Sequence, residues 1–345
     1  MISVLHVIDS LGTGGAEHQL TDLILSSDRD AFHHTVCSLA KAAGFATDLR
    51  RAGIEVVDLD VAQKYMFLRG VRRLTAVVRR VRPHIIHASL YRSGVLARAV
   101  GRRADIPVVT TLVNTTYEPE WRLDNPYLRP WKVAILQAID GVTSRRWGTA
   151  FVAISRGVKH SAERMLGIPG ERITVIHRGF PFTDASPPPS VVVALRNALA
   201  PGASPFIVNI GRLVPQKGQR YLIEAMRRVV AELPAAHLLI AGEGWLRGSL
   251  EEQIRAAGLV GSVTLLGERH DAQALLASAD IFVFPSLYEG FGVSMLEAMA
   301  AGRPCIASDI EVLREITDEG RRAVLVPIRD PEQLAQAIVA LARDP

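Results

Sequence analysis

The amino-acid sequence predicts an α/β protein of two domains, each built on a parallel β-sheet. Short β-branched runs alternate with segments of helical period, and this alternation occurs once in each half of the chain. A stretch rich in proline, glycine and serine separates the halves. With 345 residues, 48% of them hydrophobic, the chain is long enough to bury two cores.

The predicted strands lie at regular intervals. In the first half they read ISVLHVI, HHTVCSL, IEVVDL, HIIHAS and PVVTTLV, and in the second half FIVNIG, AHLLIAG, SVTLLG, IFVFPS and PCIAS. Between the halves, SPPPS and APGASP combine proline, which fixes φ and lacks a donor, with flexible glycine and serine. We therefore expect a first domain over residues 1–180, a linker over 181–205 and a second domain over 206–345.

Composition narrows the class of protein. The net charge of +5 comes from 40 Lys and Arg against 35 Asp and Glu, which permits anionic partners without demanding nucleic acid. Cys37 and Cys305 lie within predicted strands and favour core packing over a disulfide or a metal site. No apolar run approaches the roughly 20 residues that span a bilayer, and no charged leader precedes the first strand. We expect a cytoplasmic protein.

The first glycine-rich turn, HVIDSLGTGGAEHQL, follows the first predicted strand. Gly12, Gly14 and Gly15 allow close backbone approach, and the helix after them offers free N–H groups to an anion. The dinucleotide fingerprint needs a third glycine where Glu17 stands. An anion-binding loop and a plain tight turn both remain open for this stretch.

The second turn of interest is FIVNIGRLVPQKGQ, at the start of the second domain. Gly211 closes a strand, Arg212 follows it, and Lys217 precedes the next helix. Two cations on one tight loop can bind the two phosphates of a pyrophosphate, the arginine through its fork and the lysine as a point charge. The spacing excludes a Walker loop, and solvated surface charge is the alternative.

The third stretch, SLYEGFGVSMLEAMAAG, carries two carboxylates within a mostly small and apolar run. Glu289 comes just after a buried strand, where ligands of parallel sheets bind, and Glu297 lies on the following helix. Gly290 and Gly292 allow the helix N-terminus to approach a phosphate. Carboxylates accept hydrogen bonds from hydroxyls, so Glu289 is expected to bind a sugar and Glu297 a ribose. Two solvated glutamates are the alternative.

These motifs together resemble the donor site of retaining glycosyltransferases of family four. The resemblance rests on Arg212 with Lys217, the AGEG turn at 241–244, and the E-x₇-E pair of Glu289 and Glu297. It implies the GT-B fold, in which two Rossmann-like domains face each other across a central cleft. The second domain would bind a nucleotide-activated sugar and the first an acceptor. No cofactor and no metal would be required.

The resemblance also implies roles for particular residues. The catalytic residues would be Arg212, Lys217 and Glu289. Arg212 and Lys217 would neutralise the leaving diphosphate, and Glu289 would hold the donor sugar near C3. Glu297 would bind the ribose. Glu268 would border the base together with Arg269, and the amides of Phe291 and Gly292 would cap a phosphate. The other donor-site residues implied are Gly211, Gly290, Arg269, Gly14 and Gly15.

The first half departs from the family pattern at two places. Many relatives carry a histidine after the strand PVVTTLV, whereas this chain has Asn114. Arg178 stands where an uncharged residue is expected. Asn114 and His87 are the acceptor-side candidates, although a histidine at a strand end is more often packed or hydrogen-bonded. The chain stops at Pro345, so we also expect the second domain to lack the family's final crossover helix.

The implied function is transfer of a sugar, with retention of anomeric configuration, from a UDP-, GDP- or similar donor to an acceptor hydroxyl. The acceptor would be a glycan or a lipid-linked molecule in glycan, exopolysaccharide or glycolipid biosynthesis, with no nucleic acid involved. A sugar-nucleotide epimerase on the same fold and a non-catalytic nucleotide-sugar sensor remain alternatives. A nicotinamide dehydrogenase is less favoured, because its glycine fingerprint is incomplete.

Residues 64–82, KYMFLRGVRRLTAVVRRVR, predict a basic amphipathic helix. The segment holds seven basic residues and no acidic one, and apolar residues recur at spacings of 4, 3, 4 and 3 from Phe67 to Val81. Such a helix either covers a sheet with its arginines in water, or contacts an anionic membrane surface at the inner face of the membrane. Both interpretations remain open.

Overall fold

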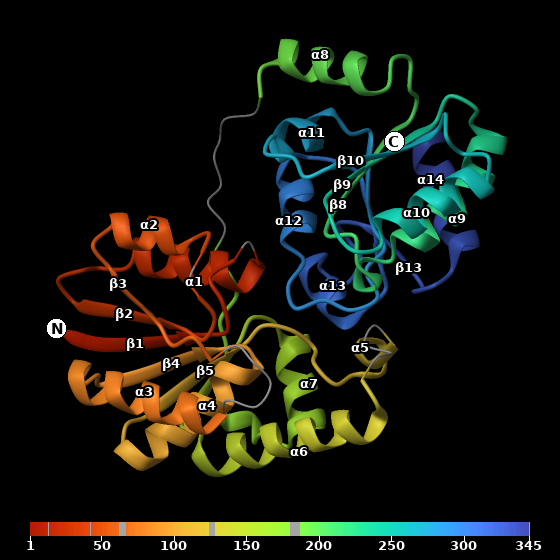
Figure 1. Ribbon diagram of the computed structural model, residues 1–345. Helices are drawn as coiled ribbons and strands as arrows, with labels where there is room; N and C mark the ends of the chain where they lie inside the picture. The colour runs from red at the N-terminus through yellow and green to blue at the C-terminus, as the bar shows by residue number, and fades with distance from the viewer. Residues whose placement is uncertain (13, 42, 62–66, 124–127, 180–186, 345) are drawn as a thin grey trace. The chain divides into compact units, whose positions relative to one another are not determined.

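The structure, a computed structural model of the 345-residue chain, describes residues 1–12, 14–41, 43–61, 67–123, 128–179 and 187–344. The chain divides into two compact units. Unit 1 comprises Met1–Glu118 and Asn125–Arg178, and unit 2 comprises Pro119–Asp124 and Gly179–Pro345. Each unit is built around one parallel sheet (Figure 1), so the prediction of two parallel-sheet α/β domains is confirmed.

Unit 1 has seven parallel strands, and the strand order reverses direction between β1 and β4. Across the sheet the strands are β3 (Glu55–Asp58), β2 (Phe32–Ser38), β1 (Ile2–Ile8), β4 (Ile85–Ser89), β5 (Val108–Leu112), β6 (Ala150–Ala153) and β7 (Ile173–Val175). The last two go beyond the prediction, because three or four residues are too few to show a period.

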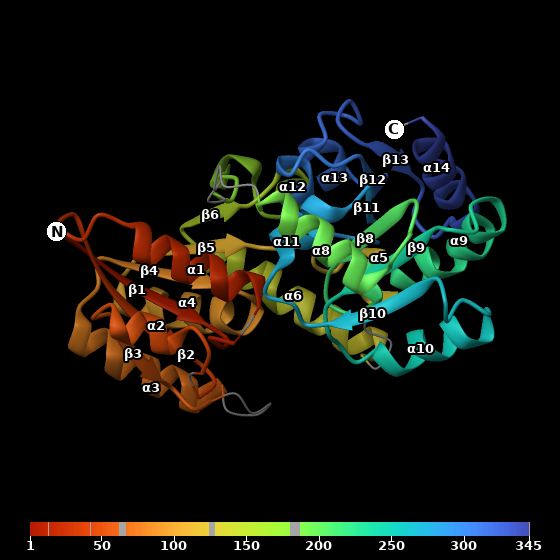
Figure 2. The ribbon, with the colours of Figure 1, turned by 90° about the horizontal axis from the view of Figure 1, so that it is seen from above.

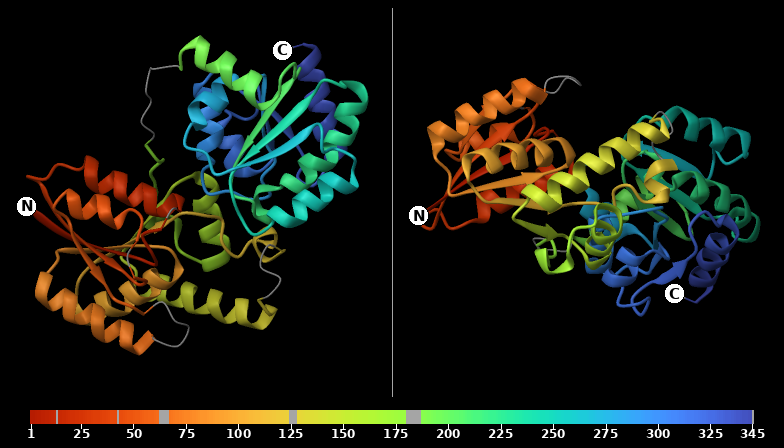
Figure 3. Two further views of the ribbon diagram at one scale, coloured as in Figure 1. Left: turned by 45° about the horizontal axis from the view of Figure 1, so that its top comes forward. Right: turned by 90° about the horizontal axis from the view of Figure 1, so that it is seen from below.

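Helices cover both faces of this sheet, as Figure 3 shows. On one face α1 (Gly15–Ser26) and α2 (Ala46–Arg51) pack apolar side chains such as Leu20 and Leu49 against the strands. On the other face lie α3 (Phe67–Val81) and α4 (Tyr91–Ala104). The helix α6 (Pro130–Trp147) packs against α4 and against α7 (Arg156–Leu166), and a 3₁₀ turn, η1 (Gly170–Arg172), precedes β7.

The described part of the basic segment 64–82 is a sheet-covering helix. Val71, Leu74 and Val78 of α3 are buried in the core of unit 1. Arg80 Nη2 lies 2.5 Å from Glu55 Oε1, and Arg73 donates to the carbonyl of Leu59. The apolar stripe therefore packs inward, and two of the arginines make contacts within unit 1. Residues 64–66, the lead-in to this helix, lie outside the described residues.

Unit 2 has six parallel strands, and their order reverses between β8 and β11. Across the sheet they are β10 (Val263–Gly267), β9 (His237–Ala241), β8 (Phe206–Ile210), β11 (Ile281–Phe284), β12 (Cys305–Ser308) and β13 (Val324–Val326). In this strand order ligands bind beyond the carboxyl ends of the two central strands, where the loops diverge. The loops after β8 and β11 are therefore the ones to inspect.

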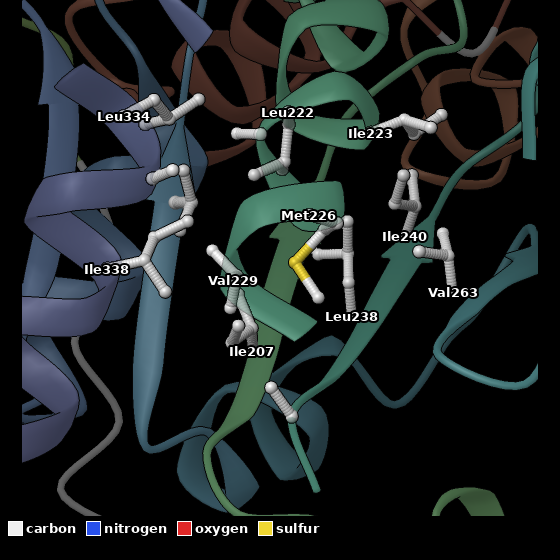
Figure 4. Packing of buried hydrophobic residues seen from close by; sticks show 14 of the residues in the cluster. Ile207, Leu222, Ile223, Met226, Val229, Leu238, Ile240, Val263, Leu334 and Ile338 are labelled. Atoms are coloured by element: carbon white, nitrogen blue, oxygen red, sulfur yellow. The ribbon is translucent and has the colours of Figure 1, made fainter. Parts of the chain in front are cut away.

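The helices of unit 2 form two layers (Figure 2). One layer consists of α9 (Gln219–Glu232), α10 (Arg247–Ala256) and α14 (Pro331–Arg343). The other consists of α8 (Pro189–Leu199), α11 (Ala272–Ser278), α12 (Val293–Ala300) and α13 (Glu311–Ile316). In Figure 4, Leu222, Met226 and Val229 of α9 point onto Ile207 and Leu238 of the sheet, which shows why the helical period of this segment matches a buried face.

Much of the described part of the predicted linker is helical. Pro189–Leu199 form α8, because proline is tolerated in the first turn of a helix, where its missing N–H costs no hydrogen bond. Arg196 of α8 binds both carboxylate oxygens of Asp280, at 2.7 and 2.9 Å, and Asp280 also accepts from Phe206 N at 2.7 Å. This helix is thus fixed to unit 2. Residues 180–186 lie outside the described residues.

Two other expectations concern cysteines and membrane spans. Cys37 and Cys305 are free and buried, and burial raises the pKa of each thiol to about 12, so the prediction of core packing is confirmed. Among the described residues, no helix combines the length and the apolar character that crossing a bilayer requires.

Candidate functional site

Four loops of unit 2 converge at the carboxyl edge of its sheet. The loop after β8 carries Arg212 and Lys217, and the loop after β9 carries Gly242 and Gly244. Arg269 follows β10, and residues 289–292 follow β11. Because β8 and β11 are hydrogen-bonded neighbours, their loops meet where the strand order reverses.

The centre of this edge is an ion pair. Lys217 Nζ lies 2.5 Å from Glu289 Oε1, and the two side chains are only 15% and 7% exposed. Lys217 Nζ also lies 4.9 Å from the ring centroid of Phe284, the last residue of β11. The structure therefore brings together two residues that the sequence assigns to one site. It adds that the two side chains bind each other.

The position of Lys217 is set by the turn that carries it. A 3₁₀ turn, η2 (Pro215–Lys217), leads into Gly218, whose φ is +65°. A Cβ atom on Gly218 would stand 2.0 Å from the carbonyl oxygen of Pro285, so only glycine fits. Gln216 Nε2 donates to Tyr288 O at 3.0 Å, and Gln216 O accepts from Leu287 N at 2.8 Å. Gln216 thus joins the β8 loop to the β11 loop, a role that no sequence pattern signals.

The AGEG turn is shaped by close backbone contact with the β8 loop. Gly242 has φ +139°, and a Cβ there would stand 2.1 Å from the Gly211 oxygen. A Cβ on Gly244 would stand 2.3 Å from the Leu213 oxygen. Leu213 N donates to Glu243 O at 2.9 Å. The glycines are therefore required by packing between loops, which places Gly211 beside this turn.

The helix α12 begins directly after the carboxylate loop. Gly292 is its N-cap residue with φ +82°, and Gly290 and Phe291 before it are buried. The first amide bonded within the helix is that of Met295, which donates to Gly292 O at 3.1 Å. Ser294 Oγ donates to Ile210 O at 3.1 Å and fixes this helix end to β8. The amides before Met295 have no partner in the helix and carry its positive dipole end.

Two other predicted donor-site residues lie at the same edge but outside the ion pair. Arg212 is exposed, and its side chain makes no hydrogen bond or ion pair with the described residues. Its carbonyl accepts from Gln219 Nε2 at 3.0 Å. Glu297 is half-buried as the fifth residue of α12. Glu297 therefore lies on the helix that follows the Glu289 loop, and its binding role stays a prediction.

Arg269 forms an ion pair with a residue of its own loop. Its Nε and Nη2 lie 2.8 and 2.5 Å from the two carboxylate oxygens of Asp271. Those hydrogen bonds raise the pKa of the Arg269 guanidinium and lower the pKa of Asp271. Glu268 beside it is exposed. The bidentate pair holds the guanidinium in place and was not visible in the sequence motif.

The glycine loop of unit 1 contacts Arg178. Gly14 is the N-cap residue of α1 and Gly15 its first residue. Arg178 Nη2 donates to Gly15 O at 2.8 Å, so the departure from the family pattern places a cation on this loop. Burial lowers the pKa of Arg178, an effect that Asp22 partly offsets. Ser10 Oγ donates to Glu17 Oε1 at 2.8 Å on the other side of the loop.

Asp9, at the carboxyl end of β1, has a structural role. Its Oδ1 accepts from Ser93 N at 2.7 Å in the first turn of α4, and burial raises its pKa. The carboxylate therefore stabilises the start of that helix. Asn114 likewise turns onto the backbone, because its Oδ1 accepts from Thr115 N at 2.9 Å. The acceptor-side role of Asn114 stays a prediction, since this hydrogen bond uses only the oxygen of its amide.

His87 belongs to a chain of hydrogen bonds across the sheet. Its Nδ1 lies 2.9 Å from His6 Nδ1 and its Nε2 lies 2.7 Å from Thr111 Oγ1. His6 Nε2 lies 2.9 Å from His34 Nδ1, and His34 Nε2 lies 2.6 Å from Ser27 Oγ. Both ring nitrogens of His87 are thus occupied. This geometry favours the packed interpretation of His87 over the acceptor-side one.

The histidine chain is neutral and has one consistent set of tautomers. Burial lowers the pKa of His6 well below its usual range and that of His87 to about 4, and burial also lowers the pKa of His34. Ser27 donates to Ile24 O, so it accepts from His34. The other donors are then fixed. Thr111 donates to His87, and His87 donates to His6. His6 donates to His34, and His34 donates to Ser27. Every ring nitrogen is satisfied without a charge.

Comparison with known proteins follows the same division of the chain. Residues 204–344 match the family model described as Glycosyl transferases group 1, and residues 13–183 match the model described as Glycosyltransferase Family 4. A phosphatidyl-myo-inositol mannosyltransferase of Mycobacterium leprae is 32% identical over 260 residues, which are 70% of this chain and 60% of that protein. The matched part thus spans less than two thirds of that relative's length.

Two further comparisons cover more of the partner chain. The UDP-Gal:alpha-D-GlcNAc-diphosphoundecaprenol alpha-1,3-galactosyltransferase of Escherichia coli is 24% identical over 282 residues, which are 80% of this chain and 71% of that protein. The crystal structure of Anabaena HepE in complex with UDP-glucose has a TM-score of 0.83 at 24% identity and covers 100% of this chain and 90% of that chain. The likeness to HepE shows the fold. The family models, the relatives and this fold agree that the chain belongs to glycosyltransferase family 4 and has the GT-B fold.

Proposed function

We propose that this chain transfers a sugar from a nucleotide diphosphate donor to an acceptor hydroxyl, with retention of anomeric configuration. The observation that carries the proposal is the Lys217–Glu289 pair at the reversal point of the unit 2 sheet, beside the start of α12. The solved structure of HepE with UDP-glucose supports a UDP-sugar as the first donor to test. The proposal also includes GDP-sugars and similar nucleotide sugars as donors.

The proposed catalytic device is positive charge placed where negative charge develops. As the bond between the anomeric carbon and the diphosphate breaks, its electron pair goes to the phosphate oxygen. Lys217 and the positive N-terminal end of α12 stabilise that oxygen, with Arg212 available from the same loop as Lys217. The acceptor hydroxyl oxygen then forms the new bond to the anomeric carbon, and its proton passes to the departing diphosphate. The reaction is proposed to need no metal and no cofactor, because these groups supply the positive charge.

Donor binding is proposed to exchange partners within the ion pair. In the structure Glu289 neutralises Lys217 at 2.5 Å. A diphosphate carries more negative charge than one carboxylate and would take over the ammonium group. Glu289 is then free to accept hydrogen bonds from the sugar hydroxyls. The pair thus holds both side chains in place until the donor arrives, which lowers the cost of ordering them.

The acceptor is proposed to be a glycan or a lipid-linked molecule that binds at unit 1. Two relatives carry lipid acceptors in their names, phosphatidyl-myo-inositol and a diphosphoundecaprenol-linked sugar. The Arg178 guanidinium on the Gly15 loop supports an acceptor that bears a phosphate. The reaction would then belong to glycan, exopolysaccharide or glycolipid biosynthesis, with no nucleic acid involved.

Contact with the inner face of a membrane is part of the proposal. The exposed arginines of α3 that make no contact with described residues are the ones able to meet anionic lipid, namely Arg69, Arg72 and Arg79. Arg73 and Arg80 are already engaged within unit 1. The membrane interpretation of segment 64–82 therefore depends on a smaller set of cations than the sequence indicated. A cytoplasmic location fits this arrangement.

The test is a thermal-shift screen of nucleotide sugars followed by turnover with acceptors. A nucleotide sugar should raise the melting temperature, and Lys217→Ala should remove that shift. Release of free nucleoside diphosphate only when an acceptor is present would support transfer. Conversion of the nucleotide sugar without acceptor would indicate an epimerase, and tight binding with no release would indicate a sensor. Binding of no nucleotide sugar would refute the proposal.

A further inference from the structure

The helix α6 exposes several large apolar side chains. Its buried residues are Val133, Asp140, Gly141, Thr143 and Ser144, so three polar side chains face inward. Its outward side is apolar, with exposed fractions of 56% for Trp131, 49% for Ile135, 41% for Ile139 and 39% for Val142. A surface helix normally places apolar residues inward and polar residues in water. This outward set of four, the α6 stripe, therefore lacks an explanation in the fold of unit 1.

A buried ion pair holds α6 in this orientation. Arg98 of α4 places Nη2 2.6 Å from Asp140 Oδ1 and Nη1 2.7 Å from Ser144 Oγ. Tyr117 Oη donates to Asp140 Oδ2 at 3.3 Å. The Arg98 side chain is 2% exposed. Rotating α6 to bury its stripe would leave this charge unpaired in the core, so the stripe stays outside.

The stripe forms one continuous line flanked by cations. Its members are spaced by 4, 4 and 3 residues, which places them on one helix face over about 16 Å at 1.5 Å per residue. Lys132 and Arg146 are exposed beside it. The only acidic residue of α6 is Asp140, which is buried on the opposite side. The outward face thus combines apolar side chains with positive charge and carries no negative charge.

Cationic neighbours extend this surface. The helices α3, α4 and α6 lie side by side, α4 between the others, on the side of the unit 1 sheet opposite α1 and α2 (Figure 1). On that side α3 exposes Arg69 and Arg72, and the end of α4 exposes Arg102 and Arg103. Exposed cations of α3 and α4 therefore lie on the same side of the sheet as the α6 stripe.

We propose that the α6 stripe inserts into the headgroup region of an anionic lipid bilayer, with α6 parallel to the membrane plane. Apolar side chains enter the acyl boundary, while Lys132 and Arg146 contact lipid phosphates. No described helix is able to cross a bilayer, which agrees with an interfacial position for α6. A second copy of the chain fits less well, because stacking this face on itself would bring like charges together. The inference rests on the proposed lipid-linked acceptor and identifies the surface that would meet it.

The test is cosedimentation of the full chain with vesicles of phosphatidylcholine and phosphatidylglycerol in a 7:3 ratio. The wild type should bind at low salt, bind less as salt rises, and bind pure phosphatidylcholine vesicles weakly. The double variant Ile135→Ser with Ile139→Ser should lose at least tenfold in vesicle affinity. The matched control is Leu23→Ser with Leu25→Ser, which removes two exposed apolar residues from α1 and should bind as the wild type does.

A charge variant gives an independent reading. Lys132→Glu with Arg146→Glu keeps the stripe and should also lose most binding to the anionic vesicles. Sedimentation of the stripe variant equal to that of the wild type would overturn the proposal. A wild type that binds no vesicles but forms concentration-dependent dimers in light scattering, which the stripe variant abolishes, would also overturn it. Each variant is checked for an unchanged melting temperature and an unchanged thermal shift with UDP-glucose. These readouts use unit 2, so failure of donor binding is distinguished from failure of membrane binding.

Discussion

The two units share one strand order and use it for different purposes. Each sheet reverses direction between its first strand and its fourth, at β1 and β4 in unit 1 and at β8 and β11 in unit 2. In unit 1 the carboxylate at that point, Asp9, holds the start of α4. In unit 2 the loops at the same point carry Lys217 and Glu289, which bind each other. The topology fixes where a binding site can form, and the loop residues decide whether a site forms there.

The interiors differ as well. Unit 1 buries an ion pair between Arg98 and Asp140 and a neutral chain of three histidines. Unit 2 packs its sheet mainly with aliphatic and aromatic side chains, as the cluster around Met226 shows. Buried polar groups cost free energy unless all are satisfied, so unit 1 depends on these specific pairs in addition to its apolar core. The comparison predicts different sensitivities for the two units.

The largest expected effect is on the buried pair of unit 1. Arg98→Met should lower the free energy of unfolding by about 3–5 kcal/mol, because it leaves Asp140 charged and unpaired in the core. Denaturant unfolding followed by circular dichroism measures this loss. The double variant Arg98→Met with Asp140→Leu should recover most of it, since neither charge then remains. A double variant as unstable as the single one would show that packing, and not charge, sets the cost.

Acid should weaken unit 1 before unit 2. His87 has a pKa of about 4 in the fold, whereas an unfolded histidine has a pKa near 6.5. The unfolded chain therefore binds more protons between these values, so stability is full above about pH 6.5 and falls as pH drops towards 4. The loss from His87 is on the order of 3 kcal/mol.

Unfolding curves at several pH values check this expectation. His87→Gln removes the titrating ring and should flatten the dependence between pH 6.5 and 4. An equal slope in the wild type and in His87→Gln would mean that His87 does not control acid stability.

The donor site should respond to loss of its cation. Lys217→Ala should weaken donor binding or turnover by about 1.5–3 kcal/mol, the range of a charge-assisted hydrogen bond. Calorimetry and diphosphate release with the stabilising donor measure the two quantities. Arg227→Ala, an exposed cation on α9, is the control and should behave as the wild type. Unchanged kinetics for Lys217→Ala would remove this residue from the site.

The smallest expected effect concerns Arg269. Because this guanidinium is paired with Asp271 on a partly exposed loop, Arg269→Ala should change donor affinity by less than about 1 kcal/mol. Arg255→Ala, which breaks an exposed pair with Glu252 on α10, provides the reference. A loss as large as that of Lys217→Ala would instead assign Arg269 to the nucleotide.

The sequence alone determined the α/β class, the two sheets and the loops at which the candidate residues lie. These follow from local periodicity and from turn chemistry, as at Gly218 and Gly242, where only glycine fits. The family resemblance drawn from Arg212, Lys217, Glu289 and Glu297 is confirmed by the family models. The sequence did not indicate α8, because the prolines that begin this helix are also typical of a break in structure.

Only the tertiary structure decided which side chains meet. The pair of Lys217 and Glu289 joins residues 72 positions apart, and the contact of His6 with His87 joins residues 81 positions apart. The orientation of α6 was equally hidden, because large apolar residues such as Ile135 and Ile139 lie outward while Asp140 lies inward, and the sequence does not say which side faces the core. Periodicity specifies that a helix has two faces. Which face is buried depends on partners such as Arg98, which the fold supplies from another helix.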